Sequence, residues 1–235
     1  MKYKVKIFRF KPGWKKPRYD IFEVDADEEE YLIDVLERIR IEYDPSLTFT
    51  HACNHGVCGS CAVKVNGIEK LACTTKMGEL GREIVVEPLD GFPVVSDLVV
   101  DYTRMFKSLQ QVKPPNILKE TKIETQVPEY VSQVREKFST CIECGICYSA
   151  CPIANTYMEY LGPAALARVL EKEEVPPIVD SKKGVWSCHM VFECSSRCPV
   201  NYSPGEKIMK LRKTILKKIF RFRGVTVEAG KMVKD

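Results

Sequence analysis

Cysteine is the residue type that offers the most chemistry in this chain, which contains eleven cysteines among 235 residues. Because eleven is odd, disulfides alone would leave one thiol without a partner. The N-terminal string MKYKVKIFRF alternates charged and apolar residues, whereas a secretory signal needs a continuous apolar stretch. We therefore expect a cytosolic, reducing compartment, in which clustered cysteines are more often metal ligands than disulfides.

The first group consists of four cysteines within the strings CNHGVCGSC and LAC: Cys53, Cys58, Cys61 and Cys73. This spacing is typical of plant-type ferredoxins, in which four thiolates hold a 2Fe-2S cluster. Gly56 and Gly59 let the loop bend its amides toward the cluster sulfurs. A zinc site is the alternative, but zinc ligands usually come in CxxC pairs. We expect His51 and His55 to be solvated, because four thiolates already complete the ligand set.

Seven more cysteines form two motifs toward the C-terminus: Cys141, Cys144, Cys147 and Cys151 in CIECGICYSACP, and Cys188, Cys194 and Cys198 in CHMVFECSSRCP. The first motif matches the run of bacterial two-cluster ferredoxins, in which the fourth cysteine serves the other cluster. By this crossover, Cys198 joins the first three cysteines of CIECGICYSACP at a 4Fe-4S cluster. The other cluster is then left with Cys151, Cys188 and Cys194.

The second motif has Val191 where a four-iron motif would supply its middle cysteine. An apolar side chain cannot bind iron, so the three remaining thiolates fit a 3Fe-4S cluster. A four-iron cluster completed by a non-cysteine ligand is the alternative for this site. A zinc or nucleic-acid-binding module is a competing reading of the whole chain, and it predicts a colourless protein.

The elements that must position the first group belong to a small mixed α/β domain. Alternation of apolar residues predicts strands around residues 3–7 and 19–24, and helical spacing predicts a helix over 27–40 with acidic residues in its first turn. Residues 62–65 and 68–72 flank Asn66-Gly67, a dipeptide typical of tight hairpin turns, and Cys73 would close the site from the second strand. A last strand is expected at residues 83–87.

The rest of the chain has little strand character. The pattern becomes helical from about Val94, residues 113–126 are typical of a linker, and helices are expected at 163–171 and 207–221. We therefore expect two domains, residues 1–105 and 106–235. Residues 207–223 form a basic amphipathic stretch, which suits docking onto membrane-anchor subunits and anionic lipid; an ordinary surface helix explains the pattern equally well.

Composition excludes several classes of protein. Hydrophobic residues make up 45% and charged residues 29% of the chain, which is typical of a soluble globular protein. The net charge of +4 comes from basic and acidic residues that are mixed along most of the chain, so no nucleic acid is expected as a partner. The sequence has no apolar run of about 18 residues that would span a bilayer.

From end to end, the chain resembles the iron-sulfur subunit of succinate dehydrogenase and fumarate reductase. The resemblance rests on PRYDIFEVDAD, DPSLTFTHAC, GVCGSCAVKVNG, VVSDLVVD, LGPAA and the two cysteine motifs. It implies the α+β class, with an N-terminal β-grasp 2Fe-2S ferredoxin domain and a C-terminal all-α, bacterial-ferredoxin-like domain. It also implies an electron wire of three clusters at the cytoplasmic side of the cell membrane, as a peripheral subunit. The expected partners are an FAD-containing flavoprotein subunit, membrane-anchor subunits and a quinone.

The same resemblance implies a quinone site beside the 3Fe-4S cluster at four positions: Pro152, His189, Val191 and, in place of a family lysine, Arg212. Succinate dehydrogenases often carry a tryptophan shortly after the first CP, whereas IANTYMEYL contains none. Asn54 and His55 also replace a common Arg-Glu pair. A related fumarate reductase that uses a soluble thiol or another non-quinone acceptor is therefore the alternative.

Overall fold

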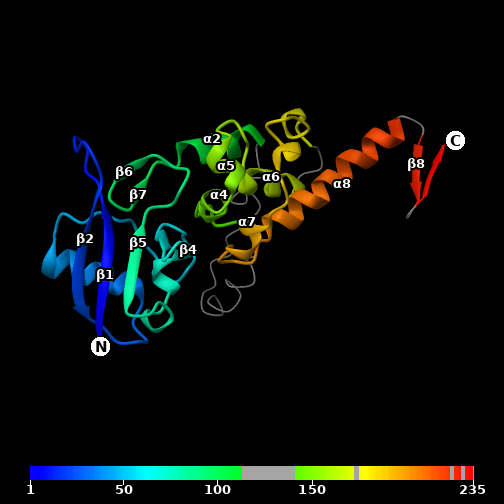
Figure 1. The fold of residues 1–235 in the computed structure, drawn as a ribbon. Helices are drawn as coiled ribbons and strands as arrows, with labels where there is room; N and C mark the ends of the chain where they lie inside the picture. The colour runs from blue at the N-terminus through cyan, green and yellow to red at the C-terminus, as the bar shows by residue number, and fades with distance from the viewer. Residues whose placement is uncertain (113–140, 172–174, 223–224, 229–230, 235) are drawn as a thin grey trace, which may run out of the picture.

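The computed structural model describes residues 1–112, 141–171, 175–222, 225–228 and 231–234. A strand-rich N-terminal part adjoins a compact helical part, from which a long helix leads toward the C-terminus (Figure 1). This arrangement confirms the expected α+β class. The linker predicted at residues 113–126 lies outside the described residues.

The N-terminal part is built on a five-stranded mixed sheet. Its strands are β1 (Lys2–Arg9), β2 (Arg18–Asp25), β3 (Ala62–Val65), β4 (Ile68–Leu71) and β5 (Glu83–Glu87). They lie in the order β2-β1-β5-β3-β4, with β1 and β5 parallel and the other pairs antiparallel. Every strand expected from alternation is present. On β1, Tyr3, Val5 and Ile7 are buried, so this face supplies the core.

The helix that packs on this sheet begins later than the sequence predicted. Helix α1 (Leu32–Arg38) continues as one π-helical stretch, η1 (Ile39–Tyr43). The acidic residues from Asp27 precede the helix and form a turn, because the Asp27 carboxylate accepts the amide of Glu29 at 3.0 Å. The Leu32 amide then donates to the carbonyl of Thr75, so tertiary pairing sets the first helical residue.

The β3–β4 hairpin has the turn that Asn66-Gly67 predicted, with φ of 49° at Asn66 and 79° at Gly67. The Asn66 side chain also accepts the Val85 amide at 2.7 Å, which ties the turn to β5. Cys73 does not lie on the second strand of the hairpin, as expected, but on the following 3-10 turn η2 (Ala72–Thr74). The turn begins where Ala72 donates its amide to the carbonyl of Cys61.

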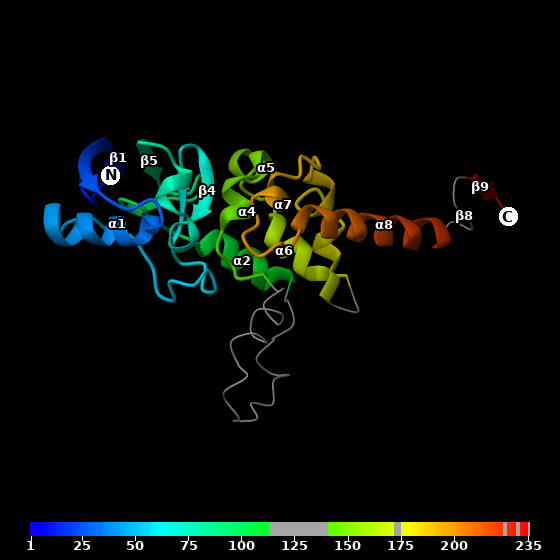
Figure 2. The same cartoon turned by 90° about the horizontal axis from the view of Figure 1, so that it is seen from below.

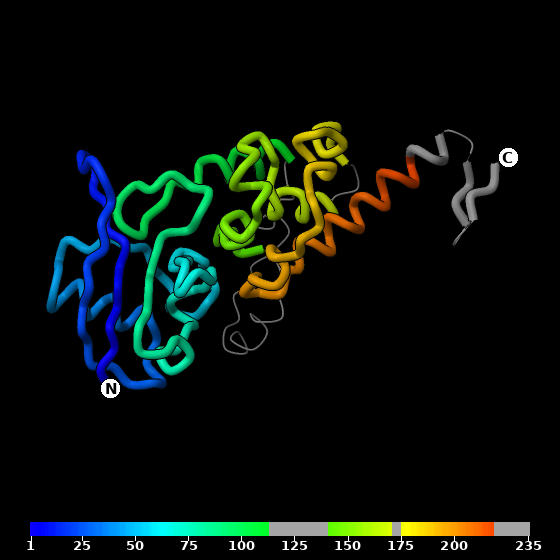
Figure 3. Tube along the Cα trace, in the orientation of Figure 1, coloured from blue at the N-terminus to red at the C-terminus, as the bar shows by residue number. Residues whose placement is uncertain are grey.

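The segment after β5 contradicts the expected helix from Val94. It forms two short strands, β6 (Val94–Ser96) and β7 (Val99–Val100), and helix α2 (Thr103–Val112) starts only afterwards. Asp97 explains the difference, because its buried carboxylate accepts the amides of Phe10 at 3.0 Å and Thr48 at 2.9 Å. These bonds hold the segment against β1 as an extended turn. Figure 3 follows the trace through this segment into the helical part.

The C-terminal part consists mainly of short helices and 3-10 turns. They are α4 (Ile146–Ser149), α5 (Pro152–Thr156), α6 (Pro163–Arg168), η5 (Val169–Glu171), η6 (Pro177–Val179), η7 (Val185–Ser187), α7 (Glu193–Ser196) and α8 (Pro204–Phe222). The two expected helices are therefore present, and α8 starts before residue 207. Strands β8 (Val225–Glu228) and β9 (Lys231–Lys234) pair as a hairpin. The expectation that this part of the chain is all-α was therefore wrong for these residues. Short alternating segments such as VTVE carry too weak a signal to stand out beside a long helix.

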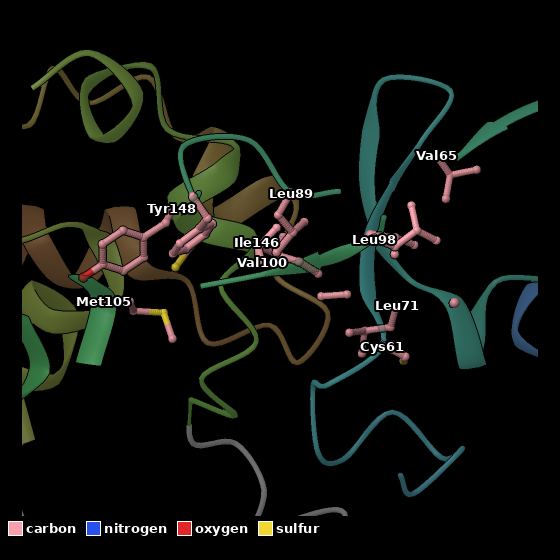
Figure 4. Packing of buried hydrophobic residues seen from close by; sticks show 14 of the residues in the cluster. Cys61, Val65, Leu71, Leu89, Leu98, Val100, Met105, Ile146 and Tyr148 are labelled. Atoms are coloured by element: carbon pink, nitrogen blue, oxygen red, sulfur yellow. The ribbon is translucent and has the colours of Figure 1, made fainter. Parts of the chain in front are cut away.

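One continuous apolar core joins the two parts. Figure 4 shows Leu89 and Val100 beside Ile146, and the ring of Phe92 lies 5.0 Å from Tyr102 and 6.0 Å from Tyr148. Seen from below, α2, α4 and α6 lie between the sheet and the extended helix α8 (Figure 2). Within the described residues, no helix has the length and hydrophobicity needed to cross a membrane. The shared core fixes the cysteine loops of the two parts relative to each other.

Candidate metal centres

The first site lies in the loop before β3 and is closed by Cys73 on η2. Backbone amides point at its sulfurs: Gly56 donates to Cys73 Sγ at 3.3 Å, and Val57 and Cys58 donate to Cys53 Sγ at 3.4 and 3.3 Å. Gly56 has a φ of +73°, and a Cβ there would lie 2.9 Å from Thr74 Cγ2. This is the amide arrangement expected from the loop glycines, and it stabilises negative charge on sulfur.

The thiols of the first site differ in their electrostatics. Burial raises the pKa of Cys61 to about 12, and its Sγ lies 3.3 Å from Cys73 Sγ. Cys58 is exposed. Partial desolvation raises the pKa of its thiol, but hydrogen bonds with Ser60 and Cys53 outweigh this effect and lower the pKa to about 6. One edge of the site is thus open to solvent and anionic, while the opposite edge is sealed in the core.

The structure corrects the expectation for one of the two loop histidines. His55 is exposed, but His51 is half-buried, with its ring stacked 5.6 Å from Phe49. The His51 Nε2 atom pairs with Glu37 on α1, and Nδ1 lies 3.2 Å from Asn54 Oδ1. His51 therefore anchors the loop to the helix. Its packing against an aromatic residue two positions earlier was the signal available in the sequence.

The second site gathers cysteines from both C-terminal motifs. Four cysteines line one small pocket: Cys141, Cys144, Cys147 and Cys198. Glu143 and Gly145 have φ values of 57° and 81°, and these left-handed residues wrap the loop around the pocket. Tyr202 donates its amide to Cys198 Sγ at 3.3 Å. This is the grouping that the crossover predicted; the role of each thiol as a ligand remains a prediction.

The third site is a separate small pocket with three cysteines, Cys151, Cys188 and Cys194. Val191 lines the same pocket, and no fourth cysteine does so among the described residues. Glu193 also lines it, but its carboxylate is 3.2 Å from the guanidinium of Arg197. The loop between the second and third cysteines is tightly curved, with Met190 and Phe192 at φ of 55° and 66°.

Three of the four residues expected at a quinone site surround the third site. Pro152, His189 and Val191 line its pocket, and 53% of Val191 is exposed. Arg212 is not among the lining residues. Its guanidinium donates instead to the carbonyl of Val185 at 2.6 and 2.8 Å and to the carbonyl of Cys188 at 2.5 Å. Arg212 therefore fixes the segment that carries Cys188.

Burial disfavours the thiolate form of five cysteines at the two C-terminal sites: Cys141, Cys144, Cys147, Cys151 and Cys194. It raises the pKa of Cys141 to about 11 and the pKa values of Cys144 and Cys194 to about 12. The buried Arg168 partly offsets this at Cys141 and pairs with Glu143 on the same loop. Four thiols around one small pocket and three around another fit iron-sulfur clusters, because metal binding compensates the cost of ionising them. Within the described residues, no three His, Cys, Asp or Glu side chains are placed to hold a single metal ion.

The first and second sites touch through Gly59. This buried glycine has a φ of +71°, and a Cβ added to it would lie 2.7 Å from Cys144 Cβ and 3.1 Å from the carbonyl oxygen of Ile142. A side chain at position 59 would therefore push the two cysteine loops apart. The sequence placed Gly59 in a bending loop but gave no sign of this contact.

Two buried charges were also missed. Asp97 carries the hydrogen bonds that hold β6 and β7, and Arg168 lies beside the loop of the second site. A charge inside the apolar string GPAALAR was the available signal for Arg168, since isolated charges on a buried helix need a partner. The string VVSDLVVD gave a similar signal for Asp97.

The three groups of cysteines fall within two regions of the chain that match known iron-sulfur domains. The family of 2Fe-2S iron-sulfur cluster binding domains matches residues 4–107, and the 4Fe-4S dicluster domain family matches residues 137–202. The fumarate reductase iron-sulfur subunit of Haemophilus influenzae is 34% identical over 87% of this chain and 89% of its own length. The succinate dehydrogenase iron-sulfur subunit of Paracoccus denitrificans is 31% identical over 91% and 88%.

A solved structure supports the fold. A chain of the Mycobacterium smegmatis Sdh1 complex in the apo form superposes with a TM-score of 0.77 at 23% identity, covering 93% of this chain and 97% of that one. The sequence relatives cover most of both chains in each comparison, and their names agree with the resemblance seen in the cysteine motifs. The chain belongs to the family of iron-sulfur subunits of fumarate reductase and succinate dehydrogenase, whose function is electron transfer.

Proposed function

We propose that this chain passes single electrons between the FAD of a flavoprotein subunit and a membrane quinone, through three clusters held in series. The observation that carries the proposal is the contact between Gly59 and Cys144, which joins the first site to the second. The third site follows directly, because Cys147 and Cys151 are four residues apart on one motif. When bound, the clusters supply one-electron redox centres.

The proposed ligands follow the three groups of thiols. The four cysteines of the first site would hold a 2Fe-2S cluster, and the four of the second site a 4Fe-4S cluster. Cys151, Cys188 and Cys194 would hold a 3Fe-4S cluster, with Val191 filling the position of a fourth ligand. The protein's own contribution is to donate amides to sulfur, as Gly56 does, and to exclude water from the buried thiols.

The third site is the proposed exit to the quinone. Its pocket is lined by Pro152, His189 and Val191, and Val191 is exposed to a docking partner. In this proposal, His189 donates a proton or a hydrogen bond to the reduced quinone. Arg212 acts as a positioning residue through its bonds to the Cys188 segment. In the same proposal, membrane-anchor subunits cover this end, and the chain is a peripheral subunit at the cytoplasmic side of the membrane.

The test is to purify the complex with its partner subunits and compare His189→Ala with His55→Ala, an exposed histidine at the first site. We expect His189→Ala to slow succinate-quinone turnover and leave flavin-side dye reduction intact, and His55→Ala to change neither. Equal loss in both assays, or no loss in either, would contradict the quinone site. Fumarate reduction by a soluble thiol without anchor subunits would instead favour the alternative acceptor.

A further inference from the structure

A buried carboxylate lies at the junction between the two parts of the molecule. Glu69 is on β4, and only 7% of the residue is exposed. It shares a strand face with buried Leu71 and precedes Cys73 of the first site by four residues. Burying a carboxylate costs free energy unless hydrogen bonds or a cation compensate it.

The compensation comes from the other part of the molecule. Ser149 on α4 donates its hydroxyl to Glu69 Oε1 at 2.9 Å, and the same hydroxyl accepts the amide of Asp90 at 2.8 Å. Ser149 is itself buried, and it lies between Cys147 of the second site and Cys151 of the third. The Asp90–Ser149–Glu69 chain therefore holds a carboxylate between the ligand segments of the first and second sites.

The cations near Glu69 are engaged elsewhere. Lys64, opposite Glu69 in the hairpin register, is 2.9 Å from Asp90 and 3.4 Å from Glu87. In the hollow beside Glu69, Lys70 is 3.7 Å from Glu79 and Arg197 is 3.2 Å from Glu193. Within the described residues, no ion pair joins Glu69 to a lysine or an arginine. Among these carboxylates, Glu69 thus differs in being held by a hydroxyl and not by a cation.

We propose that the buried Glu69 carboxylate lowers the reduction potentials of the clusters at the first and second sites; the proposal rests on the cluster assignment above. Each reduction adds an electron, and a fixed negative charge in a poorly solvated interface makes that addition less favourable. Glu69 would act on the two clusters electrostatically, across the interface, and would be a ligand of neither. Lower potentials at the first two clusters would favour transfer of the electron to the third.

The experiment compares Glu69→Gln with Glu79→Gln in the complex carrying its full set of clusters. Both changes remove one carboxylate charge from the lining of the same hollow, but Glu79 has a side chain that is 55% exposed. Paramagnetic resonance during a redox titration measures the oxidised and reduced fractions of each cluster. At the native midpoint, we expect Glu69→Gln to lower the oxidised-to-reduced ratio about threefold to tenfold at the first two clusters. We expect no change at the third cluster, nor anywhere in Glu79→Gln.

A second variant reports on the same charge. Ser149→Ala removes the hydroxyl that holds the Glu69 carboxylate in the interface, and should change the potentials of the same two clusters. Native potentials in both variants, or equal shifts at all three clusters, would overturn the proposal. Iron content and visible spectra are measured first, in the native protein, so that missing clusters would count against the cluster assignment and not against Glu69.

Discussion

The first site is local, whereas the second and third sites are interleaved. Three thiols of the first site come from a nine-residue string, and Cys73 reaches them through a hairpin that is itself part of the sheet. The second site needs Cys198 from the motif that also supplies two thiols to the third site. A local site depends on one loop, but interleaved sites require the whole helical part to fold around them.

The two regions also place their buried charges differently. In the N-terminal part, the buried Arg9 at the end of β1 pairs with the buried Asp97 at 3.2 Å and with Asp20 at 2.9 Å. In the C-terminal part, the buried Arg168 lies beside the cysteine loop of the second site. The Arg9–Asp97 pair therefore stabilises the fold, whereas Arg168 lies beside a metal site.

The largest expected effect is the loss of a whole cluster. Cys198→Ser removes one thiol from the second site, so we expect that the 4Fe-4S cluster is lost and the 2Fe-2S cluster is retained. Iron analysis and paramagnetic resonance of the reduced protein measure both. In Cys73→Ser, the matched change at the first site, the 2Fe-2S signal should disappear and both C-terminal clusters should remain. Retention of the 4Fe-4S signal in Cys198→Ser would show that the motifs do not exchange ligands.

A smaller effect is expected from breaking the ionic core of the N-terminal part. Asp97→Asn leaves Arg9 buried with less compensation, and we expect it to lower the free energy of unfolding by about 3–5 kcal/mol. Chemical denaturation of the purified chain measures this loss. The matched control is Asp90→Asn, whose side chain is 51% exposed beside Lys64 and should cost less than about 1 kcal/mol. Equal losses in the two variants would contradict a special role for the buried pair.

The same ionic core predicts sensitivity to acid. A hydrogen bond from Ser46 lowers the pKa of Asp44 to about 2, with Arg9 contributing further. Because the folded pKa lies below the ordinary value of about 4, this stabilisation is complete above pH 4 and is lost as the pH falls toward 2. Unfolding followed across this window should show Asp44→Asn with a weaker dependence on pH than the native chain. An unchanged dependence would contradict the assignment.

The smallest effect concerns the contact between the two regions. Gly59→Ala places a Cβ against Cys144, and we expect a loss of about 1–3 kcal/mol together with slower electron transfer from the first cluster to the second. Gly67→Ala is the control, because Gly67 has a similar φ of +79° but nothing within 4 Å of its Cβ position. Stopped-flow oxidation of the reduced first cluster compares the variants. Equal rates in both would contradict direct packing of the two loops.

The parts of the fold set by local pattern were predictable from the sequence. The Asn66-Gly67 turn, the alternating strands and the helix at residues 163–171 follow from short-range preferences. The elements set by tertiary polar contacts were not. The helix begins at Leu32 because of Thr75, and residues 94–100 stay extended because of Asp97. Spacing alone likewise grouped the cysteines, while the contact at Gly59 exists only in the folded chain.

The central claim is that crossover leaves the third site with three thiolates and a valine. The most direct test is paramagnetic resonance of the oxidised protein, in the native complex purified without oxygen and in Val191→Cys. We expect the native complex to show the signal of a 3Fe-4S cluster, and Val191→Cys to lose it by retaining a fourth iron, with the other two clusters unchanged. Absence of the three-iron signal from the native complex would contradict the claim, because a ligand other than cysteine would then complete a four-iron cluster.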